Sequence, residues 1–193
     1  MQTLDCRGQQ CPQPVIQTRR QLLAHPEQPL RVLVDDSISR DNISRLATSL
    51  GYHSDVREEN GLFQLDLLPG DGVQESAAAP ASGPTIVLVA SEQMGSGDVK
   101  LGQILMKNFI FTMAEGGITP DAIYFLNSGV KLTVGGSDVV EPLEKLACSG
   151  VDIASCGLCL EFFGLKDALA VGRISNMLEI VNSLHGAGRI IRP

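Results

Sequence analysis

The sequence predicts an α/β protein with two domains: an N-terminal two-layer βαβαββ sandwich, followed by a domain built on a parallel sheet. Strand and helix patterns alternate in both halves, and an Asn-Gly hairpin signal occurs in the first half. Residues 69–84 are rich in Gly, Ala, Ser and Pro and lack apolar periodicity, which is typical of a linker. We therefore expect domains at 1–68 and 85–193, joined by a flexible linker at 69–84.

Six elements are expected in the first domain. Pro12 opens a helix whose apolar residues, among them Ile16 and Leu22, form one stripe. Asn60-Gly61 predicts a type I′ turn between the last two strands. The expected strands are 3–7, 30–34, 52–57 and 62–68, and the expected helices are 12–25 and a second one that Ser37 or Ser39 caps and that runs to Leu50.

The second domain opens with a continuous apolar, β-branched run at Thr85–Ala90. Such a run indicates a strand that is buried on both faces, as in parallel sheets. The pattern then predicts a helix that Asp98 caps and that ends near Glu115, a strand at 122–126, a helix from Ser137 or Asp138 to about Ser149, a strand at 151–155, a helix at 174–184 and a short strand at 189–191. Alternating strands and helices favour a parallel α/β domain.

Composition and charge exclude several classes of function. The net charge is -7, Trp is absent and aromatic residues are few, so neither a basic face for phosphates nor a base-stacking platform is expected. No apolar run approaches the ~20 residues that span a bilayer. The first residues lack the basic and apolar regions of a signal peptide. We expect a cytoplasmic protein without a nucleic-acid or membrane partner.

The five cysteines are an odd number, which argues against a structural disulfide framework in a cytosolic protein. Cys11 directly precedes Pro12, at the expected start of a helix. Unpaired N–H groups and the helix dipole lower the pKa of a thiol at such a place and favour the nucleophilic thiolate. Pro14 stiffens the same turn. Cys11 is therefore a candidate nucleophile, with a small apolar residue at a helix start as the alternative, and Cys6 is expected to be a core residue.

Residues 4–14 read LDCRGQQCPQP, which resembles the signature L-D-x-R-G-x-x-C-P-x-P of TusA-like (SirA-like) sulfur carriers. The resemblance extends over residues 1–68 and implies that family's two-layer sandwich. It also implies that Cys11 carries a persulfide, received from a donor such as a cysteine desulfurase and passed to an acceptor protein. The frame of the motif is matched by Asp5, Arg7, Pro12 and Pro14.

A second group of thiols, Cys156 and Cys159, follows the expected strand at 151–155. Reactive groups and ligands gather beyond the carboxyl ends of parallel strands, so this pair is a second candidate site. Cys-x-x-Cys is also half of a zinc site, but zinc needs four ligands, and Cys148 and the distant His185 complete the set poorly. No metal or other cofactor is expected. A sulfur-accepting or redox-active dithiol and inert packing both remain open.

The second domain resembles DsrE-like sulfur-relay proteins. The resemblance rests on the strand 85–90, the Met94-Gly95-Ser96-Gly97 loop and the cysteine after strand 151–155, and it places a reactive thiol at Cys156. The order of the two domains resembles a family of selenium metabolism proteins. The glycine loop alone is not a dinucleotide site, because Lys100 stands where the third glycine of G-x-G-x-x-G is needed.

These observations favour a carrier or transferase of sulfur or selenium, sulfurtransferase-like if it is an enzyme, that uses Cys11 and then Cys156, with Cys159 in support. Two alternatives remain: a non-catalytic regulatory or scaffold module, and a thiol–disulfide redox protein built on Cys156 and Cys159. The helix expected at 98–115 is apolar nearly all round in its C-terminal half, which indicates either deep burial or a homo-oligomer interface in the second domain.

Overall fold

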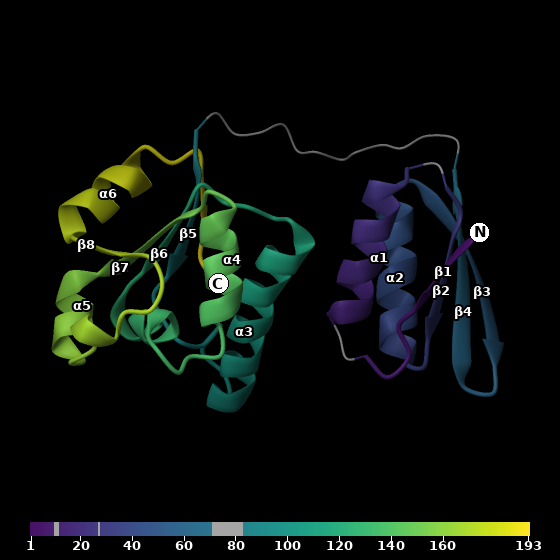
Figure 1. Cartoon of the computed structure of the whole chain (residues 1–193), viewed down its shortest axis with the longest axis horizontal. Coiled ribbons are helices and arrows are strands. Elements are labelled where there is room, and N and C mark those ends of the chain that lie inside the picture. The colour runs from purple at the N-terminus through teal and green to yellow at the C-terminus, as the bar shows by residue number, and fades with distance from the viewer. Residues whose placement is uncertain (10–11, 27, 71–82) are drawn as a thin grey trace. The chain divides into compact units, whose positions relative to one another are not determined.

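A computed structural model describes residues 1–9, 12–26, 28–70 and 83–193 of the chain. The chain divides into two compact units, Met1–Ala78 and Ala79–Pro193 (Figure 1). Most of the expected linker at 69–84 lies outside the described residues, so its boundaries stay a prediction.

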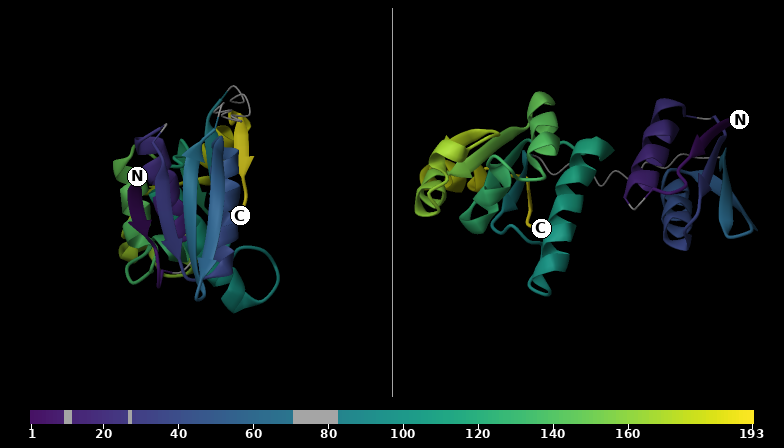
Figure 2. Two further views of the ribbon diagram at one scale, coloured as in Figure 1. Left: turned by 90° about the vertical axis from the view of Figure 1, so that its right-hand side faces the viewer. Right: turned by 60° about the horizontal axis from the view of Figure 1, so that its bottom comes forward.

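The first unit is a four-stranded mixed sheet with both helices on one face, as two further views show (Figure 2). The sheet order is β1-β2-β4-β3, in which β1 and β2 are parallel and the other pairs are antiparallel. The elements are β1 (Gln2–Asp5), α1 (Gln13–Ala24), β2 (Leu30–Val34), α2 (Ser37–Ser49), β3 (Tyr52–Glu59) and β4 (Leu62–Pro69). This βαβαββ order confirms the predicted fold class of the first domain.

The alternation of side chains along its strands and the conformations that its turn residues tolerate explain the fold of the first unit. Alternate residues of β2 point into one core with Ile43 and Leu65, because successive side chains of a strand face opposite sides of the sheet. Asn60 and Gly61 both have positive φ, as a type I′ turn requires. The predicted cap of α2 was wrong: Asp36 accepts the N–H of Ser39, so the cap lies just before both serines that had been considered.

The second unit is a five-stranded, all-parallel sheet in the order β8-β7-β6-β5-β9. Its elements are β5 (Thr85–Val89), α3 (Val99–Gly116), β6 (Ala122–Phe125), η1 (Asn127–Thr133), α4 (Val140–Cys148), β7 (Asp152–Cys156), α5 (Gly157–Phe162), η2 (Lys166–Ala168), β8 (Arg173–Ser175), α6 (Met177–His185) and β9 (Arg189–Ile191). The parallel α/β class predicted for this domain is confirmed.

The two faces of this sheet have separate cores. On one face, α3 and α4 contribute Met106, Ile110 and Leu143 to a large cluster. On the other face, Ile180 of α6 packs on a smaller cluster that includes Cys156. The helices therefore cover the sheet from both sides, as parallel sheets require (Figure 1).

One expected helix was partly wrong. The range 174–184 was read as a single helix, but Arg173–Ser175 form strand β8, and α6 starts only at Met177 with Asn176 as its cap. The short elements η1, α5 and η2 were not predicted, and α4 starts at Val140 rather than at Ser137 or Asp138. Over the described residues, none of the helices has the length and hydropathy that crossing a bilayer demands.

Candidate functional site

The end of β1 is fixed by an ion pair within the predicted sulfur-carrier motif. Arg7 donates to the carboxylate of Asp5 from Nε at 2.8 Å, from Nη2 at 2.5 Å and from its backbone N–H at 3.2 Å. These contacts lower the pKa of Asp5 to about 2. The next residue, Gly8, adopts a positive φ of 71° and donates its N–H to Asp35 at 2.8 Å. Asp5 and Arg7 thus shape the turn that leads toward α1.

The two motif prolines lie at the start of α1. Pro12 is the N-cap residue, and its carbonyl accepts the N–H of Ile16 at 3.1 Å. Pro14 is buried in the first turn, where its missing N–H costs no helical hydrogen bond. Cys11, the predicted nucleophile, lies outside the described residues, so the sequence alone places it directly before this N-cap.

Cys6 is a core residue, as the sequence predicted. Its side chain is fully buried, and Sγ lies 3.6 Å from Oε1 of Gln17 on α1. Burial, together with the negative charge of Asp5, raises the pKa of the Cys6 thiol to about 11. Cys6 is therefore protonated at neutral pH and is shielded from reagents.

We predict that Cys6 resists alkylation at pH 8 while the exposed Cys148 reacts, as site-resolved mass spectrometry can show. In the folded state Cys6 keeps its proton up to a pKa of about 11, whereas in the unfolded chain it loses the proton near the ordinary pKa of 9.0. The contribution of this thiol to the free energy of unfolding should therefore decrease as the pH rises from 9.0 toward about 11. The difference in urea midpoint between wild type and Cys6→Ala should shrink over that range, and a constant difference would contradict the shift.

In the second unit, Cys156 and Cys159 lie where β7 meets α5. Cys156 ends the strand and is only 2% exposed, whereas Cys159, within α5, is partly exposed. Cys156 lies close enough to Cys159 to act on its pKa. Burial and the neighbouring Cys156 side chain raise the pKa of Cys159, against the opposing effect of a backbone N–H from Asn127. The structure therefore brings this predicted pair together.

The N–H of Asn127 lies 3.2 Å from Sγ of Cys159. Asn127 follows β6 and has a φ of 48°, a left-handed conformation that asparagine tolerates better than most residues. Asn127 opens η1, which runs against the end of β5: a Cβ on Gly129 would lie 2.4 Å from the carbonyl oxygen of Val89. The sequence did not predict a role for Asn127, because every residue except proline has a backbone N–H that could act as the donor.

Close packing also explains the glycine between the two cysteines. A Cβ on Gly157 would lie 2.9 Å from Cγ2 of Ile174 on β8. β8 pairs with β7 so that Ser175 is the register partner of Cys156. Strand β8 therefore leaves little room for a side chain at position 157, at the start of α5.

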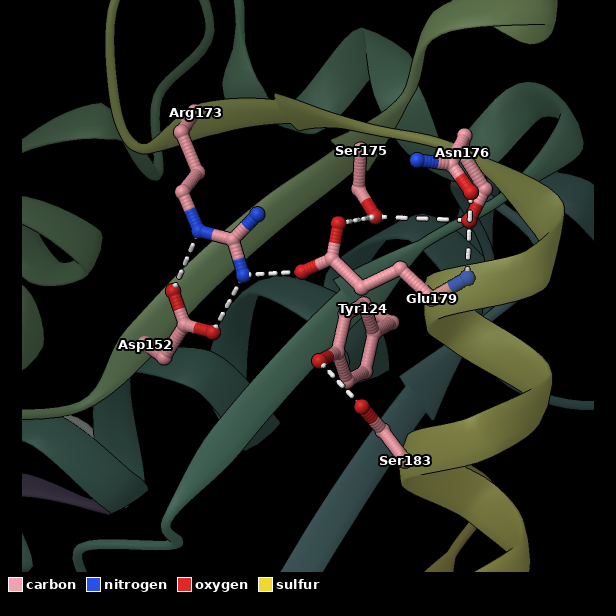
Figure 3. A network of polar contacts seen from close by, with 7 residues as sticks. All are labelled: Tyr124, Asp152, Arg173, Ser175, Asn176, Glu179 and Ser183. Atoms are coloured by element: carbon pink, nitrogen blue, oxygen red, sulfur yellow. Dashed lines mark hydrogen bonds and ion pairs between the residues drawn. The ribbon is translucent and has the colours of Figure 1, made fainter.

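A polar network fastens α6 over this side of the sheet (Figure 3). Arg173 binds Asp152 through two hydrogen bonds, at 2.9 and 2.7 Å, and also pairs with Glu179. Glu179 accepts a hydrogen bond from Ser175 Oγ at 2.7 Å, and these contacts lower its pKa. Farther along α6, the hydroxyls of Tyr124 and Ser183 lie 2.8 Å apart. Figure 3 shows the Glu179 carboxylate between Arg173 and Ser175, so α6 is tied to both β7 and β8.

Over residues 1–9, 12–26, 28–70 and 83–193, no three His, Cys, Asp or Glu side chains gather closely enough to hold a metal ion. Within the same residues, Cys148 ends α4 and His185 ends α6.

Comparisons with known proteins were informative for the first unit. The sequence model of the family described as sulfurtransferase TusA matches residues 2–66. A SirA-like protein from Desulfitobacterium hafniense is 36% identical, with 37% of this chain and 100% of that chain covered, at a TM-score of 0.35. The ychN protein from E. coli is 17% identical (57% and 99% covered, TM-score 0.44), and a protein of unknown function from Bacteroides thetaiotaomicron is 15% identical (60% and 99% covered, TM-score 0.41). No curated protein sequence matches the chain significantly.

Proposed function

Because residues 2–66 belong to the TusA sulfurtransferase family, we propose that the chain is a chalcogen carrier that accepts sulfur or selenium as a persulfide-type adduct on Cys11. The observation that carries the proposal is the family match itself, which encloses the whole LDCRGQQCPQP motif. The turn held by Asp5 and Arg7 and the helix start at Pro12 supply the frame of that motif.

The reaction proposed for Cys11 is thiol exchange. Its thiolate attacks the outer sulfur or selenium of a donor persulfide, a new S–S or S–Se bond forms, and the donor cysteine leaves as a thiolate. Cys11 precedes the N-cap of α1, whose first N–H groups and dipole favour a negative charge nearby. Pro12 offers no capping side chain that would compete for those N–H groups.

We extend the proposal to the second unit, which we regard as DsrE-like. Cys156 with Cys159 would receive the chalcogen from Cys11, and the predicted linker at 69–84 would allow the transfer. Support comes from a second thiol pair at the carboxyl end of a parallel strand. The order of the domains resembles the selenium metabolism protein YedF, which supports a link to selenium use in the cytoplasm.

The proposed partners are a cysteine desulfurase or a similar donor, a downstream acceptor protein and further copies of this chain. An exposed apolar stripe on α3 supports self-association, because an unpartnered apolar stripe of a helix favours burial. It lies in the N-terminal half of α3, whereas the sequence pattern emphasised the C-terminal half. Its members are Leu101, Ile104 and Leu105.

The test is to locate the adduct. The full chain is incubated with a cysteine desulfurase and either cysteine or selenocysteine, then alkylated and digested with trypsin without reductant. Cleavage releases residues 8–19, which contain Cys11 as their only cysteine. We expect a reducible sulfur or selenium increment on this peptide. Its absence with every donor would overturn the proposal and favour a scaffold module.

A thiol–disulfide redox protein is a second candidate function, which the closeness of Cys156 and Cys159 at the junction of β7 and α5 favours. Such a protein would form the disulfide with a thiol–disulfide buffer alone, without any chalcogen. A reversible reduction potential that disappears in both Cys156→Ser and Cys159→Ser would support this function, and a disulfide that never forms in the buffer would exclude it.

A further inference from the structure

The two thiols of the second unit, Cys156 and Cys159, differ in their exposure to solvent. Cys156 lies in the small cluster under Ile180 of α6, and the network of Arg173 and Glu179 fastens that helix to the sheet (Figure 3). Cys159 is partly exposed and lies at the margin of both clusters of this unit. A partner's persulfide therefore meets Cys159 first, although the family resemblance points to Cys156.

We propose that Cys159 receives the chalcogen in the second unit and that Cys156 then expels it as hydrosulfide or hydroselenide, leaving a disulfide between the two cysteines. The proposal rests on the proposed function, because it assumes a persulfide-type cargo. It assigns separate tasks to the two residues and makes Cys159, rather than Cys156, the acceptor.

The backbone supplies Cys159 with a fixed donor. The N–H of Asn127, 3.2 Å from Sγ, is aimed by the left-handed conformation of that residue and favours the thiolate form of Cys159. A preorganised N–H of this kind stabilises the negative charge that Sγ of Cys159 carries as the attacking thiolate. Asn127 is therefore a positioning residue for Cys159.

The first step is an exchange. The Cys159 thiolate forms a bond to the outer sulfur or selenium of a donor persulfide, the donor's own bond breaks, and the donor cysteine leaves with the electron pair as a thiolate. The proton released from Cys159 passes to solvent or to the leaving thiolate. The product is a persulfide or selenopersulfide on Cys159.

The second step uses the buried thiol. Cys156 belongs to the smaller cluster on which Cys159 packs, where β7 meets α5, so its thiol is the sulfur that neighbours the loaded Sγ of Cys159. Attack on that Sγ forms the Cys156–Cys159 disulfide, breaks the bond to the outer atom and releases it as hydrosulfide or hydroselenide. The disulfide is reset by an external dithiol reductant, which is oxidised in turn.

The test uses the full chain with Cys11→Ala and Cys148→Ser, which leaves the second unit's pair and the buried Cys6 as its thiols. Inorganic polysulfide is the probe, so loading bypasses Cys11. We expect the chain to release hydrosulfide and to lose two hydrogens in mass. Adding Cys156→Ser should preserve an adduct on Cys159 with a lifetime roughly tenfold longer. Adding Cys159→Ser should abolish both adduct and release.

Chymotryptic cleavage after Leu158 separates the two cysteines, so the position of the trapped adduct can be read directly. An adduct that forms on Cys156 at the parental rate in the Cys159→Ser chain would overturn the proposal. A parent chain that keeps its adduct without forming a disulfide would overturn the release step. Neither result bears on loading of Cys11, which is measured with a desulfurase on the 8–19 peptide.

A matched pair of variants tests the Asn127 donor. Asn127→Gly keeps the left-handed conformation, whereas Asn127→Val strains it, because a β-branched residue disfavours positive φ. With Cys148 retained as an internal control, alkylation of Cys159 should be roughly tenfold slower in the valine variant and unchanged in the glycine variant. Equal Cys159 rates in two folded variants with equal Cys148 rates would show that the donor has no such role.

Discussion

Replacing Cys11 with alanine is expected to abolish chalcogen loading by a cysteine desulfurase on the peptide of residues 8–19. Only a thiolate can form the new S–S or S–Se bond, and alanine removes the attacking atom while it keeps the turn that Asp5 and Arg7 hold. If Cys11 feeds the second unit, loading of Cys156 and Cys159 by the same donor should fall by at least about tenfold. Intact-mass and peptide-level spectrometry without reductant measure both effects.

The matched control is Cys148→Ser, because Cys148 is an exposed thiol at the end of α4 and has no part in the proposed transfer. Its loading on the 8–19 peptide should equal that of wild type. A Cys11→Ala chain that still gains a desulfurase-dependent adduct at wild-type extent would contradict the assignment of Cys11. Unchanged loading of the second unit would contradict the relay alone.

Gly129→Ala is expected to destabilise the second unit by about 3 kcal/mol, because overpacking a tight contact costs this much when neither side can move. The added Cβ would meet the carbonyl oxygen of Val89 at 2.4 Å and its carbon at 3.1 Å, and both belong to the backbone. Relief requires η1 to move away from β5, which would also shift the N–H of Asn127 from Cys159. Protected amides of β5 to β7 should exchange with deuterium roughly 100-fold faster.

Gly97→Ala is the matched control, since a Cβ at Gly97 has no atom within 4 Å. Exchange in this variant should match wild type. Peptides of the first unit supply an internal reference, and they should be unaffected in both variants. Wild-type exchange in Gly129→Ala would mean that the backbone of η1 adjusts freely, and the close approach would then lose its structural importance.

Local chemistry made much of the fold predictable. Asn60-Gly61 specified its turn through the conformations that these two residues tolerate, and Asp98 caps α3 by accepting the N–H of Leu101, as expected. β8 was missed because three residues carry too little pattern, and Ile174 also fits the helical periodicity of the segment that follows. What makes β8 a strand is its pairing with β7, a contact between segments far apart in sequence.

The candidate site, like the fold, could be predicted from the sequence only in part. Cys156 and Cys159 were predicted as a site from their place after a buried strand, and the structure does bring the two thiols together. Which of them is accessible depends on α6 and on the ion pairs of Arg173, and these are tertiary contacts that no local pattern encodes. The role of Cys11 stays a prediction from the motif, because that residue lies outside the described part of the chain.

The position of β9 has a consequence for how this protein is made. β5 opens the second unit but is flanked by β6 on one side and by β9, formed by Arg189–Ile191, on the other. On the ribosome, the first unit can complete its sheet while later residues are still being added, because β1 to β4 pair only among themselves. The apolar strand β5, by contrast, keeps one open edge until Arg189–Ile191 have emerged. Until then the nascent second unit exposes an apolar strand edge, which favours aggregation and is suited to chaperone binding.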